Sequence, residues 1–289
     1  MNFKSAKELL EICTKEGILI SEVMIQREVT EGEKQREEVI NRMHTAFNIM
    51  KESANRAINN PAQSMGGLLG GQAKKLSDHV GSGKTACGSL VTRGIAYAMG
   101  VLEVNAQMGL IVAAPTAGSS GVIPGTMLTL QDEYGFTDDQ IVTALFNTGA
   151  IGYLAMKNAT VSGAVGGCQA EIGIASAMAA SAAVELLGGT PAQSLDAAST
   201  VMMNMLGLVC DPVAGLVEYP CQNRNASGVA NALVATEMAM SGITQLIPFD
   251  EMLEILYKVG RDMPVELRET ALGGCALSES ACNACKACK

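Results

Sequence analysis

The sequence has 289 residues, of which 48% are hydrophobic but only 3% are aromatic, and it contains no tryptophan. Its core must be built from Ala, Val, Ile, Leu and 17 methionines, which favours a mostly α fold because Ala and Met are strong helix formers. The net charge of −9 argues against a nucleic-acid partner. A chain of this length holds one large domain, or one domain with a helical extension.

The sequence also indicates where the protein works. Residues 1–4 lead straight into an amphipathic segment and carry no secretory signal. The most apolar window, residues 173–188, lacks the roughly 20 strongly apolar residues of a membrane span. We therefore expect a cytoplasmic protein with no membrane partner, in which nine cysteines indicate metal or redox chemistry rather than disulfides.

Helical periodicity begins near the N-terminus. Ser5 is placed to cap a first helix that reaches Glu16. A longer helix is expected over residues 31–59, where apolar residues recur at steps of three and four and Pro61 follows the end. The later helices are expected at residues 84–106, 138–158, 169–187, 191–209, 226–246 and 250–259.

Residues 63–85 form the first loop with functional character. The loop contains glycine pairs and ends in Gly-Ser-Gly-Lys-Thr, which resembles the end of a phosphate-binding P-loop. Asp78 stands where that motif needs its first glycine, so we reject this interpretation. Lys74, which can neutralise a carboxylate, and His79, which can titrate near neutral pH, are candidate catalytic residues. The competing interpretation of His79, and of His44 on the long helix, is a structural histidine.

A second loop, residues 116–121, follows a short β-like run expected at residues 109–115. Its sequence, Thr-Ala-Gly-Ser-Ser-Gly, offers hydroxyls and free backbone N–H groups just before a helix that begins near Val122. This combination suits a small anion such as an amino-acid carboxylate, and a plain Gly/Ser connector is the alternative. The candidate substrate-binding residues are Thr116, Ser119, Ser120 and Gly121.

Three cysteines lie at expected helix ends beside glycine or proline. Cys168 follows a glycine-rich turn, Cys210 lies where a helix stops before Asp-Pro, and Cys221 lies in a polar loop before the next helix. Free N–H groups at helix ends favour a thiolate, whereas a cysteine buried as a small hydrophobe is more often found in mid-helix. We therefore favour metal or cluster ligation. The C-x41-C-x10-C spacing matches neither a zinc finger nor a compact ferredoxin run.

The tail carries its own cysteines. Cys282, Cys285 and Cys288 form a C-x2-C-x2-C run without the fourth cysteine and proline of a ferredoxin half-site. Such a run can bind zinc, carry a separate cluster or act as a redox-active dithiol. A free, solvent-exposed tail is the remaining alternative.

The cysteine segments resemble the α chain of the iron–sulfur-dependent L-serine dehydratases. The resemblance rests on GAVGGCQAEIG, LGLVCDPVAGLVEYPCQNRN and GLIVAAPTAGSSGVIPG, and it extends over nearly the whole chain. It implies deamination of L-serine to pyruvate and ammonia with a [4Fe–4S] cluster and without pyridoxal phosphate. The cluster ligands that it implies are Cys168, Cys210 and Cys221. One iron is then left without a protein ligand and can act as a Lewis acid on the serine hydroxyl.

The resemblance also implies roles outside the cluster. Arg224 is a candidate for binding substrate or screening the cluster's charge. Cys288 matches the position of a C-terminal cysteine that caps the open iron in some relatives, and Cys285 is the alternative for this role. Because the chain enters the catalytic-type helices within a few residues, we expect a β subunit as partner. The β subunit is an alternative source of the catalytic base, and apolar residues at 9–20 are its expected docking elements.

Together these observations predict a single large helical catalytic domain with glycine-rich loops at helix termini. We expect an N-terminal helical segment at residues 1–60, the cluster-binding catalytic domain at 61–274 and a cysteine-rich tail at 275–289. A cysteine desulfidase with the same cluster chemistry is the nearest alternative. From a different class, an electron-transfer or zinc-binding protein that uses the tail cysteines also stays open.

Overall fold

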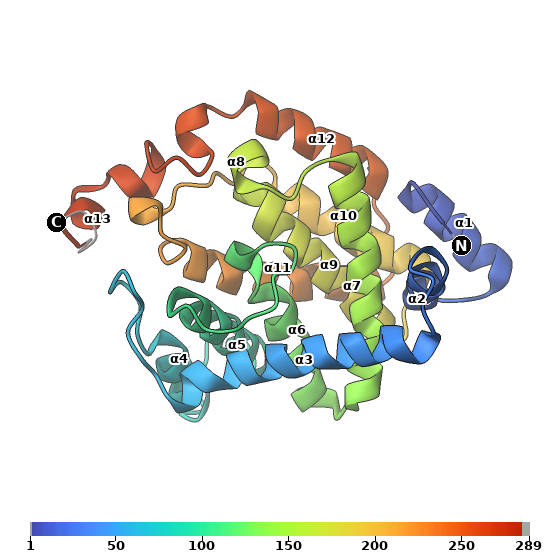
Figure 1. The fold of residues 1–289 in the computed structure, drawn as a ribbon, viewed down its shortest axis with the longest axis horizontal. Coiled ribbons are helices and arrows are strands. Elements are labelled where there is room, and N and C mark those ends of the chain that lie inside the picture. Colours follow the sequence, from blue (N-terminus) through green and yellow to red (C-terminus); the bar gives the residue numbers. More distant parts are fainter. Residues whose placement is uncertain (1, 285–289) are drawn as a thin grey trace.

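The computed structural model describes residues 2–284 and shows a protein built from helices (Figure 1). Within that range no β-strand forms, and an isolated bridge joins Cys210 and Arg268. The mostly α fold expected from the composition is confirmed. The helices are α1 (Ala6–Glu16), α2 (Ile20–Glu31), α3 (Arg36–Asn59), α4 (Gln72–Val80), α5 (Gly88–Ala106), α6 (Val122–Tyr134), α7 (Asp138–Asn158), α8 (Gly163–Gly166), α9 (Ile174–Leu186), α10 (Pro191–Met205), α11 (Cys221–Met240), α12 (Phe249–Asp262) and α13 (Glu279–Ala284).

Helix α9 lies inside the helical body and packs against α7, α10 and α11 (Figure 1). Every residue from Ile174 to Glu185 is buried, and most of them are Ala or Ser. Because these side chains are small, the neighbouring helices can approach α9 closely on all sides. The core is therefore filled by close-packed backbones, which explains how the fold forms with so few aromatic residues. Among residues 2–284, no helix combines the length and the apolar character needed to cross a bilayer.

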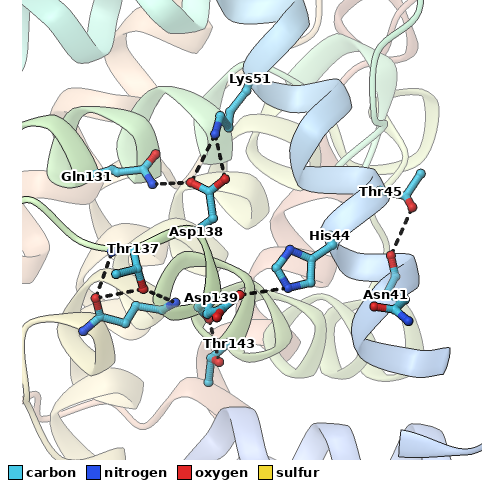
Figure 2. Close-up of polar contacts among 10 residues, drawn as sticks. Asn41, His44, Thr45, Lys51, Gln131, Thr137, Asp138, Asp139 and Thr143 are labelled. Carbon is cyan, nitrogen blue, oxygen red and sulfur yellow. Dashed lines mark hydrogen bonds and ion pairs between the residues drawn. The ribbon is translucent and has the colours of Figure 1, made fainter. Parts of the chain in front are cut away.

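Helix α3 crosses this body and is fastened to the start of α7 (Figures 1 and 2). The Lys51 ammonium lies 2.8 Å from Asp138 Oδ2, and the Gln131 amide donates to Asp138 Oδ1 at 2.8 Å. His44 Nε2 lies 3.1 Å from Asp139 Oδ1. Both aspartates belong to the first turn of α7, where the helix dipole favours negative charge. His44 therefore makes a structural contact between two helices.

Several helix boundaries differ from those expected. Helices α2 and α4 were not expected, and the long helix begins at Arg36 rather than near residue 31. Helix α11 begins at Cys221, although its polar first turn was expected to be a loop. Tertiary contacts outweigh local composition here. Gln222 donates to the Met99 carbonyl oxygen at 3.2 Å, and Asn225 donates to the Gly118 carbonyl oxygen at 2.7 Å.

The β-like run expected at residues 109–115 does not form a strand. It is an extended coil between α5 and α6, and within residues 2–284 the backbone groups of residues 110–113 make no backbone hydrogen bond. A strand needs a neighbouring strand to complete its ladder, and this part of the chain offers none.

The N-terminal apolar residues are not exposed docking elements, so that expectation is wrong. Leu9 and Ile20 are fully buried, and Leu10, Ile12 and Ile18 pack against the core. Helices α1 and α2 use these side chains to bind their own chain, since α2 packs on α7 and α1 contacts α10 and α12.

Candidate metal centre

Cys168 follows a turn that requires glycine. After α8, Gly167 adopts a φ of +72°, and a Cβ there would lie 2.8 Å from the Leu208 carbonyl oxygen. Cys168 follows directly, and residues 169–173 form a single π-helical turn that leads into α9. Such π-turns are frequent at functional sites because they turn side chains out of the ordinary helical positions.

Cys210 and Cys221 come from the next two segments. Cys210 lies in a non-helical stretch after α10 and is bracketed by the C-terminal part of the chain. Its N–H donates to the Leu267 carbonyl oxygen at 2.8 Å, and its carbonyl oxygen accepts from the Glu269 N–H at 2.7 Å. Cys221 is the first residue of α11. All three cysteines are buried, and all are free thiols.

The sulfurs of Cys168 and Cys210 converge with a carboxylate. Ligand atoms of Cys168, Cys210 and Glu171 all lie within 4.8 Å of one another. The Cys168 thiol and burial together raise the pKa of Cys210 far above its usual range. Burial, followed by the charge of Cys168, raises the pKa of Cys221 to about 12. Cys168 is thus close enough to both other thiols to oppose their ionisation.

This donor set fits a metal centre. Buried thiols with raised pKa values, such as Cys210 and Cys221, are the groups that a bound cation would convert to thiolates. Sulfur donors select zinc or iron–sulfur clusters over hard cations. The backbone also leaves room beside the sulfurs, because a Cβ on Gly163 would lie 2.5 Å from Glu171 Oε2 and 3.2 Å from Cys210 Sγ.

Glu171 is a site residue that the sequence analysis missed. Its Oε2 lies 3.9 Å from Cys168 Sγ and 3.7 Å from Cys210 Sγ, while Oε1 accepts a hydrogen bond from Thr116 Oγ1 at 2.7 Å. Burial raises the pKa of this carboxyl group, and the Thr116 hydrogen bond opposes that effect. The available signal was an acidic residue three positions after Cys168, in an otherwise apolar run.

The loop of residues 116–121 lies at this site through Thr116. Ser119 and Ser120 are fully buried, and the Ser120 hydroxyl donates to the Ala117 carbonyl oxygen at 2.8 Å, within the loop itself. The Gly121 N–H donates to Asn225 Oδ1 at 3.0 Å, which ties the loop to the first turn of α11. The backbone N–H groups of residues 117 and 118 make no hydrogen bond within the described chain.

Lys74 and His79 both lie on α4. Lys74 Nζ is 2.5 Å from Asp78 on the same helix. The ring of His79 is exposed, with Nδ1 3.4 Å from the Ser82 hydroxyl. Within residues 2–284 neither side chain is bonded to the three cysteines or to Glu171, so their catalytic role stays a prediction.

Two buried carboxylates, also missed from the sequence, attach the preceding glycine-rich loop to the site. Glu218 accepts hydrogen bonds from the Ser64 hydroxyl at 2.7 Å and from the Gly66 N–H at 2.8 Å. Glu103 accepts from the Ala73 N–H at 2.9 Å and from the Gln222 amide at 3.2 Å, next to Cys221. The loop is therefore held by hydrogen bonds at Ser64 and Gly66 and again at Ala73. Ser64 has a structural role there.

Arg224 contacts the site from α11. Its Nη1 donates to Cys168 Sγ at 3.5 Å, and its Nη2 lies 2.6 Å from Asp211 Oδ1. Burial alone would lower the pKa of Arg224, but the neighbouring Cys168 and Asp211 outweigh it and raise the pKa. Cys288 lies outside the described residues.

The sequence matches the family described as "Serine dehydratase alpha chain" over residues 15–276. It is 47% identical to the probable L-serine dehydratase alpha chain of Bacillus subtilis over 95% of this chain and 91% of the relative. It is 42% identical to the L-serine dehydratase alpha chain of Peptoniphilus asaccharolyticus, over 96% and 94% of the two chains. It is also 35% identical to a longer L-serine dehydratase of Streptomyces coelicolor, over 97% of this chain and 62% of the relative.

Proposed function

Because the chain belongs to the serine dehydratase alpha chain family, we propose that it is the α chain of an enzyme that converts L-serine to pyruvate and ammonia. The observation that carries this proposal is the buried group formed by Cys168, Cys210 and Glu171, with Cys221 close enough to share its electrostatics. A protein that only transferred electrons would not need an anion-binding loop beside these sulfurs, which is the role we propose for residues 116–121.

The cofactor in this proposal is a [4Fe–4S] cluster held by Cys168, Cys210 and Cys221. When bound through three cysteines, such a cluster supplies one iron that can act as a Lewis acid on the substrate hydroxyl. The protein keeps the three thiols buried, which limits access of water and oxidants. Cys288 is proposed as a further, displaceable ligand.

The chain's own residues then bind and orient the substrate. We assign the serine carboxylate to the backbone N–H groups of residues 117 and 118, while the Thr116 hydroxyl, which donates its one proton to Glu171 Oε1, holds the loop at the sulfur site. In the structure the hydroxyls of Ser119 and Ser120 serve the loop itself, so we assign these two residues, with Gly121, to shaping it. Arg224 adds positive charge beside Cys168 and offsets the charge of the thiolates.

Loss of water from serine also requires a group that accepts the α-proton. We propose Lys74 or His79 of α4, or a group of a partner chain, for this step. Both side chains are on the surface, where a partner chain could enclose them together with bound substrate.

Anaerobic reconstitution tests the proposal. The wild-type chain should bind about four irons with matching sulfide and, with its partner chain present, form pyruvate from L-serine. Each of Cys168→Ser, Cys210→Ser and Cys221→Ser should lose the cluster, whereas Cys87→Ser, an exposed cysteine at the start of α5, should retain it. A chain that bound one zinc through these cysteines and formed no pyruvate would overturn the assignment.

We further propose that a β chain completes the enzyme. The relatives from Bacillus subtilis and Peptoniphilus asaccharolyticus are named alpha chains, which supports this, and the Streptomyces coelicolor relative, named without a chain designation, is longer than this chain. The isolated chain should then hold its cluster but turn over little serine, and purified β chain should restore turnover. Full pyruvate formation by this chain, shown to be free of partner by mass analysis, would refute the proposal.

A further inference from the structure

Asp211, the residue after Cys210, lies between the sulfur site and the C-terminal part of the chain. It is only 2% exposed. Its Oδ2 accepts a hydrogen bond from the Cys275 N–H at 2.6 Å. Its Oδ1 forms an ion pair with Arg224 Nη2 at 2.6 Å. Among the described residues, this oxygen accepts no hydrogen bond of regular geometry.

Arg224 extends this link to the sulfurs. Its side chain is 13% exposed, so few positions are open to it, and Nη1 donates to Cys168 Sγ at 3.5 Å. A buried guanidinium keeps its place only if it is paired, and Asp211 is the carboxylate that pairs with it. The contact of Arg224 with Cys168 therefore depends on where Asp211 points.

The C-terminal belt, which we define as residues 265–275, fixes Asp211 from the other side. Its residues Leu267 and Glu269 bond the backbone of Cys210 on both sides. Gly274 has a φ of +60°, and a Cβ at this position would collide with the Asp211 carboxylate. The belt thus approaches Asp211 as closely as a glycine backbone allows.

We propose that Asp211 is a positioning residue that couples docking of the C-terminal belt to the sulfur site, because it holds Arg224 against Cys168 while the belt is in place. The inference rests on the proposed cluster. Mutation of a group that hydrogen-bonds a metal ligand typically changes the metal affinity 10–100-fold. Release of the belt therefore weakens cluster retention although the belt supplies none of the three ligands.

Two variants break the coupling at opposite ends. Asp211→Asn keeps an oxygen for the Cys275 N–H but removes the charge that pairs with Arg224. Gly274→Ala keeps that charge but displaces the belt. The matched controls are Asp196→Asn, whose carboxylate accepts from the Gln245 N–H at 3.0 Å, and Gly242→Ala, with a φ of +85° and open space around it.

The readouts are the rate of iron loss to a chelator under anaerobic conditions and hydrogen exchange of residues 264–277 in the cluster-free chain. Asp211→Asn and Gly274→Ala should each lose iron about tenfold faster than wild type, and Gly274→Ala should also speed exchange in the belt. Both controls should stay within about twofold of wild type.

If Gly274→Ala frees the belt amides but leaves the rate of iron loss unchanged, the coupling is refuted. If Asp211→Asn does not fold, the glycine variant alone decides the matter. A wild-type chain that bound no iron would overturn both this inference and the proposed function, and the reconstitution would reveal that before any variant was compared.

Discussion

Thr116 joins the substrate-side loop to the sulfur site through a single hydroxyl. That hydroxyl donates to Glu171 Oε1 at 2.7 Å and lies 3.1 Å from the Ser119 hydroxyl. A buried carboxylate that loses such a donor is left partly unsatisfied, at a cost of about 1–3 kcal/mol. The side chain is therefore placed to affect both the position of Glu171 and the binding of substrate.

We predict that Thr116→Val raises the KM for L-serine about tenfold, as expected for the loss of roughly 1.4 kcal/mol of hydrogen bonding. Steady-state pyruvate formation by the reconstituted enzyme measures this. Thr116→Ser keeps the donor and should stay within about threefold of wild type. Equal damage from both changes would show that the methyl group, rather than the hydroxyl, matters.

Glu185, at the end of α9, is a second buried acid, outside the site. Its Oε2 accepts from the Asn147 amide at 2.7 Å and from the Ser21 N–H at 3.3 Å. Burial raises the pKa of this carboxyl group above its usual 4.5. Burial and the nearby Glu185 also raise the pKa of Cys13 to about 11, so that thiol stays neutral.

The sign of the pH effect follows from the raised pKa of Glu185. Protonated Glu185 contributes its full stability below the unfolded-state pKa, and that contribution is lost as the pH rises through the higher folded-state pKa. Glu185→Gln cannot ionise, so it should gain relative to wild type between pH 5 and pH 8. We expect its Tm to be about 2–4 °C higher at pH 8, and scans of the cluster-free chain in reductant at both pH values measure this. A Tm difference that did not change with pH would contradict the prediction.

Where two helices pack closely, a glycine often lies at the point of contact. Gly100 of α5 faces α3, and a Cβ at this position would lie 2.5 Å from the Ala54 carbonyl oxygen. Neither partner can yield without moving a helix backbone. The contact between α3 and α5 therefore tolerates no side chain at that point.

We predict that Gly100→Ala lowers the free energy of unfolding by about 1–3 kcal/mol, as overpacked sites do. Gly149→Ala on α7 is the matched control, because a Cβ there meets only Met24 at an ordinary 3.6 Å. Alanine should raise stability at that position by up to about 1 kcal/mol. The free energies of unfolding of the two variants, measured by urea unfolding, should thus change in opposite directions. If both lost stability equally, backbone contact would not be the cause.

For the molecule as a whole, the tail beyond the belt is the part open to direct test by deletion. Residues between 275 and 284 line a pocket of about 490 Å³ together with Tyr219 and Asn223. If the tail competes with substrate for the sulfur site, deleting residues 280–289 should lower the apparent KM for L-serine. The deletion should also shorten any lag before pyruvate formation reaches its steady rate. Cys288→Ser should reproduce the deletion and Cys282→Ser should not. Unchanged kinetics in all three would leave the tail without a role in turnover.

The limits of sequence reasoning can be followed through individual residues. The helical class follows from the abundance of Ala and Met, and the three cysteines were recognisable because each lies beside glycine or proline. Glu171, Glu103 and Glu218 were not recognisable, since each works through partners that lie far away in the sequence. The first turn of α11 was mistaken for a loop for the same reason, because its polar side chains are satisfied only in the folded protein.

The two backbone hydrogen bonds that hold Cys210 come from residues that are made late in synthesis. Leu267 and Glu269, which hold Cys210 on both sides, lie far downstream of all three cysteines. During synthesis the three cysteines therefore emerge before the residues that hold the backbone of Cys210. The sulfur site is therefore completed only once nearly the whole chain has been made.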